Sequence, residues 1–195
     1  MLRKIALICL ITVSVFAMHR AEVNINDTDL ELGIGLDIGQ FNTNVEPDTM
    51  FLGVKILNAD NTHSSSSGYK NDPYYEMSFL MKRAVSNNGL SFGMGVKANY
   101  TKDFASMPLG LEATYKIPAK GIVPMYLNAD VYYGPKVLSF GHADRFYEYR
   151  VNYDIELIEN GRVTVGYRSV NTNYDDGRKD YIYNKSFYFG FKFLF

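Results

Sequence analysis

The sequence predicts an all-β fold, an antiparallel up-and-down transmembrane β-barrel of roughly 8–10 strands preceded by a signal peptide. Three observations predict it. Apolar and polar residues alternate along most of the chain after residue 28, and a period of two is the period of a strand. The alternating runs are about 9–11 residues long, which is enough for a tilted strand to cross a bilayer. Tight turns alternate with longer polar connections, as in outer-membrane barrels.

The N-terminus has the layout of a secretory signal peptide. Arg3 and Lys4 precede a nearly unbroken apolar run from Ile5 to Phe16, which is too short to be a transmembrane helix. Small residues allow cleavage after Ala17 or after Ala21, and Ala17 fits better. The expected division of the chain is a signal peptide at 1–17, a short N-terminal extension at 18–28 and an outer-membrane barrel at 29–195.

The composition of the mature chain argues against disulfide bonds and against nucleic-acid binding. Cleavage removes Cys9, the only cysteine, so disulfides do not stabilise the exported protein. Cleavage after Ala17 also removes two of the 20 Lys and Arg residues, so that the 21 Asp and Glu residues exceed the remainder by three. This slightly acidic balance gives no indication of nucleic-acid binding.

The alternating runs follow one another from residue 29 to the C-terminus. In Asp29–Gly39, leucine and isoleucine take one face, and acidic residues and glycines take the other. In Leu90–Tyr100, the face with Leu, Phe, Met and Val opposes Ser, Gly, Lys and Asn. The other expected strands are 49–59, 74–84, 108–117, 125–133, 146–157, 162–170 and 183–195.

The run at 29–39 is a ninth strand, whereas bacterial barrels normally have an even number. It either pairs with a further short segment, such as Val23–Asn26, to make ten strands, or it lies along the wall or inside the lumen.

Short and long connections alternate between the runs. The tight turns are SNNG at 86–89, PAKG at 118–121 and ENG at 159–161. The long polar connections are 58–73, 101–107, 134–144 and 171–181. If the C-terminus lies in the periplasm, the tight turns lie there too, and these four long connections lie outside the cell.

The last strand carries a phenylalanine at every second position up to the chain end. We expect these side chains to face lipid, and the strand to close the barrel against the first one. A terminal Phe on such a strand also resembles the signal that barrel-assembly machinery recognises. The residues of this expected assembly signal are Phe187, Phe189, Phe191, Phe193 and Phe195.

The opposite faces of the runs carry charges of both signs. A Lys or Arg facing lipid near the bilayer midplane costs about 2–4 kcal/mol, so these side chains should point into the lumen. Ion pairs that fill the interior and a narrow polar pathway are both compatible with this pattern. A barrel of roughly 8 strands is just filled by its side chains, which favours a filled or very narrow interior. The lumen-facing candidates are Lys55, Glu76, Lys82, Lys97, Glu112, Lys116, Asp130, Glu148, Arg150, Asp154, Arg162, Arg168 and Lys192.

Tyrosines occur near the ends of many runs. Tyr residues at these places are typical of the aromatic girdles at the two membrane interfaces, although Tyr is also favoured in ordinary sheets. The residues concerned are Tyr74, Tyr75, Tyr100, Tyr115, Tyr133, Tyr147 and Tyr167.

The stretch YLNADVYYGPKVLSFGHADRFYEYRVNYDIEL, followed by RVTVGYRSVN and an acidic, glycine-containing loop, resembles the YfaZ family of Gram-negative outer-membrane proteins. The matching features are Tyr132 and Tyr133 before a Pro-containing loop, the run Val165–Arg168 and the terminal Phe195. The likeness is strongest from Leu127 to Asn173. It implies a porin-like barrel in the outer membrane and brings no catalytic residues with it.

Three functions remain open from the sequence. The first is a small outer-membrane barrel that acts as a narrow porin-like channel for small solutes. The second is a structural or interaction barrel whose loops, above all 58–73, bind a partner without transport. The third is a soluble periplasmic ligand-binding barrel with its apolar faces turned inward.

No nucleophile, base and orienting group occur at a plausible spacing, so we expect neither an enzyme nor a cofactor or metal site. The expected partners are outer-membrane lipid and, during insertion, the barrel-assembly machinery. We expect a monomer that binds no nucleic acid.

Overall fold

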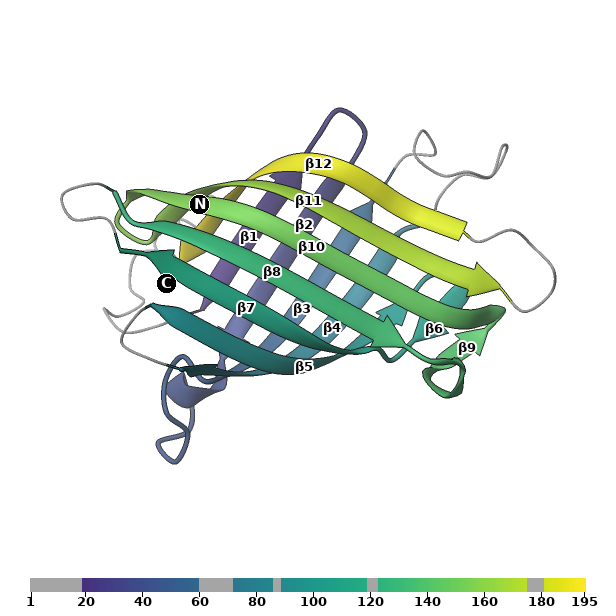
Figure 1. The fold of residues 1–195 in the computed structure, drawn as a ribbon, viewed down its shortest axis with the longest axis horizontal. Coiled ribbons are helices and arrows are strands. Elements are labelled where there is room, and N and C mark those ends of the chain that lie inside the picture. Colours follow the sequence, from purple (N-terminus) through teal and green to yellow (C-terminus); the bar gives the residue numbers. More distant parts are fainter. Residues whose placement is uncertain (1–18, 60–71, 86–88, 119–122, 175–180) are drawn as a thin grey trace, which may run out of the picture.

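The structure, a computed structural model, describes residues 19–59, 72–85, 89–118, 123–174 and 181–195. Antiparallel strands make up most of this part of the chain, and ten of them close into a barrel (Figure 1). The all-β barrel predicted from the alternating pattern is therefore confirmed. The expected signal peptide at 1–17 lies outside the described residues.

The barrel wall follows chain order. Each wall strand pairs with its neighbours on both sides, and the pairing of the first strand with the last closes the ring. Two short strands pair with each other at one end of the wall, and two 3-10 helices lie in the connections. The wall strands are β1 (Arg20–Ile25), β2 (Leu30–Asp37), β3 (Met50–Asn58), β4 (Tyr74–Ala84), β5 (Leu90–Tyr100), β7 (Leu109–Ile117), β8 (Met125–Gly134), β10 (Ala143–Ile158), β11 (Gly161–Tyr174) and β12 (Tyr181–Leu194); the short strands are β6 (Phe104–Ser106) and β9 (Ser139–Gly141), and the helices are η1 (Ile38–Gln40) and η3 (Lys136–Leu138).

The seam of the barrel lies between β1 and β12. Strand β1 pairs with β12 from Arg20 opposite Leu194 onward, and with β2 on its other side. Below the paired strands, the backbone N–H of His19 donates to the carbonyl of Phe195 (3.0 Å), and that of Phe195 donates to His19 (2.9 Å). The N-terminal extension expected at 18–28 is therefore wrong, because this segment contains a wall strand. The expected ninth run gains the partner that makes ten.

The two ends of the barrel differ in their connections. We call the end with His19 and Phe195 the turn end and the opposite end, with β6 and β9, the loop end (Figure 1). The connections after β4, β7 and β10 lie at the turn end and are short, whereas those after β3, β5, β8 and β11 lie at the loop end and are longer. The predicted sorting of connections is confirmed for these eight strands. Segments 60–71, 86–88, 119–122 and 175–180 of these connections lie outside the described residues.

The first hairpin reverses this sorting. Strands β1 and β2 meet at the loop end in a tight turn, in which the Asn26 side-chain oxygen accepts from the backbone N–H groups of Thr28 (2.8 Å) and Asp29 (2.6 Å). This local side-chain bonding is how Asn closes a short turn. The connection from β2 to β3, residues 38–49, is long and lies at the turn end.

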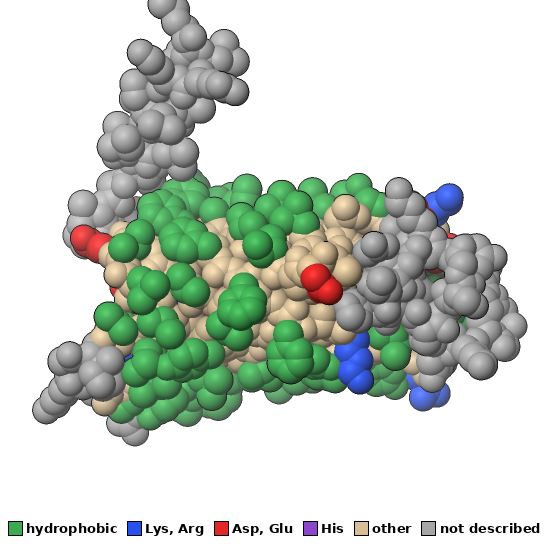
Figure 2. Space-filling model, turned by 90° about the horizontal axis from the view of Figure 1, so that it is seen from above, with side chains coloured by type: hydrophobic (Ala, Val, Ile, Leu, Met, Phe, Trp, Pro, Cys, Tyr) green, Lys and Arg blue, Asp and Glu red, His purple; other side chains and the backbone are tan. Residues whose placement is uncertain are grey.

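The outer wall is apolar all the way round. Every wall strand turns large apolar side chains outward, such as Phe187 (73% exposed) and Met94 (71% exposed). Figure 2 shows these side chains spread over the wall, with charged side chains at its margins. Many charged residues of the same strands are buried, among them Glu31, Glu76 and Arg168. A water-soluble protein has the opposite arrangement, with its charged side chains on the surface and its large apolar side chains inside.

The tyrosines near strand ends divide between the two faces. Tyr75, Tyr100, Tyr133 and Tyr147 are exposed on the outer wall, where a girdle would lie. Tyr74 is only 3% exposed and faces the interior, so its expected place in a girdle is wrong. It has the same strand parity as the inward-facing Glu76, and this parity decides the face.

Candidate functional site

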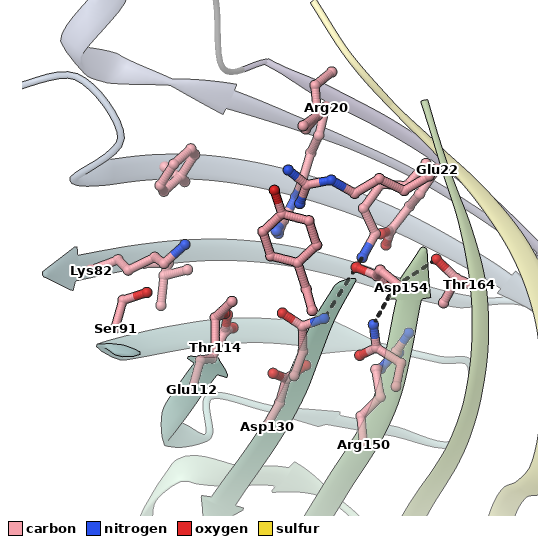
Figure 3. A pocket seen from close by; sticks show the side chains of 18 of the residues that line it. Arg20, Glu22, Lys82, Ser91, Glu112, Thr114, Asp130, Arg150, Asp154 and Thr164 are labelled. Atoms are coloured by element: carbon pink, nitrogen blue, oxygen red, sulfur yellow. Dashed lines mark hydrogen bonds and ion pairs between the residues drawn. The ribbon is translucent and has the colours of Figure 1, made fainter. Parts of the chain in front are cut away.

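Among the described residues, the barrel interior contains a cavity of about 360 Å³. The sequence-predicted lumen residues line it, with two exceptions: Glu148 and Arg168 are buried beside it. Those that line it are Lys55, Glu76, Lys82, Lys97, Glu112, Lys116, Asp130, Arg150, Asp154, Arg162 and Lys192. Alternation along the strands thus brings together side chains that are far apart in the sequence (Figure 3).

A layer of ion pairs crosses the middle of the barrel. The Arg150 guanidinium on β10 binds both carboxylate oxygens of Glu31 on β2, at 2.6 and 2.9 Å. Lys97 on β5 lies between Glu148 (2.8 Å) and Glu76 (3.2 Å). Two-point contacts between a guanidinium and a carboxylate are strong and directional, so this layer connects four strands across the lumen.

A second group of ion pairs joins β11, β12 and the first turn. The guanidinium of Arg168, which is 0% exposed, donates through Nη2 to Asp29 (3.1 Å) and through Nε to the Asn184 side-chain oxygen (2.6 Å). Its Nη1 lies 3.3 Å from Glu31. Asp29 also accepts from Ser186 (2.9 Å). Each buried charge therefore has opposite charge or hydrogen bonds around it, which burial requires.

An apolar layer fills the lumen at the loop end. The rings of Phe104 and Phe146 lie 6.0 Å apart, and those of Tyr74 and Tyr183 lie 5.4 Å apart. The Tyr183 hydroxyl donates to the carbonyl of Asp72 (2.6 Å). Phe104 reaches this layer from β6, which pairs with β5 and β9. The members of the layer are Leu57, Ala59, Tyr74, Phe104, Ala143, Phe146, Val170 and Tyr183.

The turn end of the lumen is polar and hollow. The lining of the cavity extends to Asp48, Gly89 and Leu194, which lie where strands begin or end beside the chain termini. Basic side chains from several strands surround this part of the cavity. Lys192 binds Asp154 at 2.8 Å, and Asp154 also accepts a hydrogen bond from Thr164 (2.8 Å), beside which Figure 3 shows it. The cavity therefore opens toward the turn end, while aromatic side chains fill the other end.

Further ion pairs stand around this opening. Arg162 lies 3.1 Å from Glu156, and Lys82 lies 4.0 Å from Asp48. Lys55, deeper in the cavity, lies 2.8 Å from Glu22.

The sequence prediction missed three lining residues of the first strand, Arg20, Glu22 and Asn24. All three belong to β1, which was expected to be an extension apart from the alternative of a short strand at Val23–Asn26. The signal was present, because polar Arg20, Glu22 and Asn24 alternate with Ala21 and Val23. Six residues are a short run to recognise next to a signal peptide.

The phenylalanines of β12 divide along the strand. Phe187, Phe189 and Phe191 are exposed on the outer wall, whereas Phe193 and Phe195 are half-buried. The ring of Phe195 meets that of His19 edge-on, 5.8 Å away, at the seam. The role of these residues as an assembly signal stays a prediction.

Within the described ranges, no group of three or more His, Cys, Asp or Glu residues could hold a metal ion. Likewise, none of the helices in the described part is long and apolar enough to cross a membrane.

Comparison with protein families adds to this geometry. The family model described as YfaZ precursor matches residues 2–195. The chain belongs to the YfaZ family. The match covers the first hairpin as well as the region of strongest resemblance. All ten wall strands of this YfaZ protein therefore lie within the matched region. A search of curated proteins finds no match.

Proposed function

We propose that this YfaZ protein is an integral β-barrel of the Gram-negative outer membrane. The observation that carries the proposal is the apolar outer wall, to which all ten wall strands contribute, around an interior of buried charges. Lipid is the surrounding that such a wall matches, because apolar side chains face acyl chains and charges are kept inside. A soluble periplasmic barrel would need the reverse arrangement.

Fractionation of cells that express the full chain tests this location. We expect the protein in the outer-membrane fraction, resistant to extraction with salt or alkaline carbonate and released by detergent. Recovery in the soluble periplasmic fraction would contradict the proposal.

We further propose that the barrel is closed to solutes in this conformation and works as a structural or interaction barrel through its ends. Two features of the interior support this: the ion-pair layer around Arg150 and Lys97, and the apolar layer around Phe104 and Phe146. Ions pass an aromatic layer poorly, because a narrow apolar constriction tends to exclude water.

Planar-bilayer recording tests the closed state. The unmodified protein should insert without discrete conductance steps. The double variant Phe104→Ala, Phe146→Ala should give intermittent steps, because it removes both rings of one contact in the layer. Phe140→Ala, on an exposed side chain of β9, is the matched control and should stay silent. Steady conductance of the unmodified protein would contradict closure.

A narrow channel is the second candidate, favoured by the polar cavity at the turn end. It requires the apolar layer to move, and Phe104 reaches that layer from a strand of only three residues. Steps in the unmodified protein that vanish when β6 is cross-linked to β9 would favour this candidate.

Two further expectations stay proposals. Barrel-assembly machinery would insert the chain with the help of the last strand, and the protein would have no enzymatic activity.

A further inference from the structure

Three charged side chains in the cavity lining make neither an ion pair nor a hydrogen bond among the described residues: Arg20, Lys116 and Asp130. The Lys116 side chain is exposed and lies over the ring of Tyr126 (5.7 Å), which leaves Arg20 and Asp130 as the two enclosed ones. Both line the cavity and are half-buried. Most other charges in the lining are paired, such as Lys55 with Glu22 and Lys192 with Asp154. Arg20 and Asp130 have opposite charges in the same cavity but no directly bound partner, and a partly enclosed charge is costly without one. Both side chains can therefore bind a ligand.

Arg20 and Asp130 lie on opposite sides of the cavity. Counted round the ring, Arg20 on β1 is six strands from Asp130 on β8 in one direction and four in the other. Glu112 on β7 stands directly opposite Asp130 on the adjacent β8. Figure 3 shows Arg20 on one side of the cavity and the two carboxylates on the other. Arg20 therefore faces the Glu112–Asp130 pair across the cavity, although Glu22 lies on the side of Arg20 and Lys116 on the side of Glu112. We call the side of Arg20 and the side of the two carboxylates the two walls.

Local contacts hold the groups on their walls. Arg20 lies over Gly35, where an added Cβ would come within 2.7 Å of its Nε. Glu112 accepts a hydrogen bond from the Tyr132 hydroxyl (2.6 Å). These contacts keep the Arg20 guanidinium and the Glu112 carboxylate on opposite sides of the cavity, so the two groups do not bind each other directly.

We propose that this cavity binds a small zwitterion with a primary ammonium group and a carboxylate, of the amino-acid or short-peptide class. The ammonium would bind at Glu112 and Asp130, and the carboxylate at Arg20. Both ligand charges are then neutralised, whereas an ion of one sign would leave the other wall unpaired. A volume of about 360 Å³ is suited to a ligand of this size. The ligand enters from the turn end, and its binding does not depend on conduction.

Calorimetry on the full mature protein in detergent micelles tests the proposal. The probes are glycine, diglycine, triglycine and tetraglycine, which carry the same two charges at increasing separation. At least one should bind saturably. Its N-acetyl and its C-terminal amide forms should each bind at least tenfold more weakly, because each lacks one charge. No saturable binding by any probe, or equal binding of the blocked forms, would overturn the proposal.

Variants assign the binding to the two walls. Arg20→Gln and Asp130→Asn should each weaken the best probe at least tenfold. Lys185→Gln, on an exposed side chain of β12, is the control and should leave binding unchanged. Heat-modifiable migration on gels verifies that each variant is folded. Unchanged binding in both folded wall variants would overturn the site, while outer-membrane fractionation and bilayer recording would be unaffected by that result.

Discussion

The loop end and the turn end of the barrel are built from the same strands but have opposite interiors. At the loop end, aromatic side chains from β4, β6, β10 and β12 pack into a layer, and the charges next to it are fully buried. At the turn end, charged side chains surround a cavity, and their ion pairs are partly exposed to it, as for Arg162 and Glu156 (18% and 21%). Substitutions inside the loop end should therefore cost as much free energy of unfolding as substitutions in a protein core. Substitutions inside the turn end should cost less, because water reaches the side chains there.

A single strand shows how the difference is encoded. The inward residues of β10, read from the loop end, are Phe146, Glu148, Arg150, Asn152 and Asp154. They pass from the apolar layer to the ion pairs and then to the cavity. Strand parity fixes the face, and position along the strand fixes the layer. We therefore expect the same kind of substitution to change the free energy of unfolding by different amounts at the two ends.

The largest expected effect compares two arginines on the same face of β11. Arg168→Met should lower the free energy of unfolding by about 3–5 kcal/mol, because Asp29 and Glu31 would be left as buried charges without their partner. Arg162→Met at the turn end should cost about 1 kcal/mol, because its pair with Glu156 is partly exposed (18% and 21%) in the cavity and Glu156 keeps contact with water. Denaturant unfolding in lipid vesicles measures both values. Equal losses would show that the two ends do not differ in burial.

A smaller effect compares two outward leucines. Leu111→Arg, on β7, should cost about 2–4 kcal/mol in lipid, because this residue lies well inside the apolar band. Leu157→Arg, near the turn-end terminus of β10, should cost about 0–1 kcal/mol at the interface. The same unfolding assay measures them. If neither substitution has an effect in lipid, the outer wall does not face acyl chains.

The smallest change concerns the mature N-terminus. Cleavage after Ala21 would remove His19 and Arg20, and with them both backbone hydrogen bonds to Phe195. We therefore expect cleavage after Ala17, a residue outside the described part of the chain. Intact-mass measurement of the outer-membrane protein should give a chain that begins at Met18. A chain that begins at Glu22 would remove Arg20 from the proposed ligand site as well.

Much of the wall was predictable from the sequence, because a period of two decides which side chains share a face. The outward Phe187 and the inward Lys97 follow directly from it. The inward side of Phe146 follows from the same parity, but its contact with Phe104 does not. Phe104 lies on β6, and three residues show no periodicity.

The pairing of the charges was not predictable either. Arg150 meets Glu31 across the lumen, 119 positions earlier in the chain. Such a contact depends on the register of every strand between them and on closure by β1. Because the sequence prediction left β1 out of the barrel wall, it did not include the β1–β12 pairing that fixes the register of the ring.

Cysteine labelling tests most directly whether the lumen opens only at the turn end and whether this end faces the periplasm. The mature chain has no native cysteine if Cys9 leaves with the signal peptide. Ser91→Cys lies in the cavity lining, and Val137→Cys lies exposed at the loop end. In intact cells, a membrane-impermeant maleimide should label Val137→Cys but not Ser91→Cys, and permeabilising the outer membrane should make Ser91→Cys reactive. Equal labelling of both in intact cells would contradict a closed loop end, and labelling of Ser91→Cys alone would contradict the orientation.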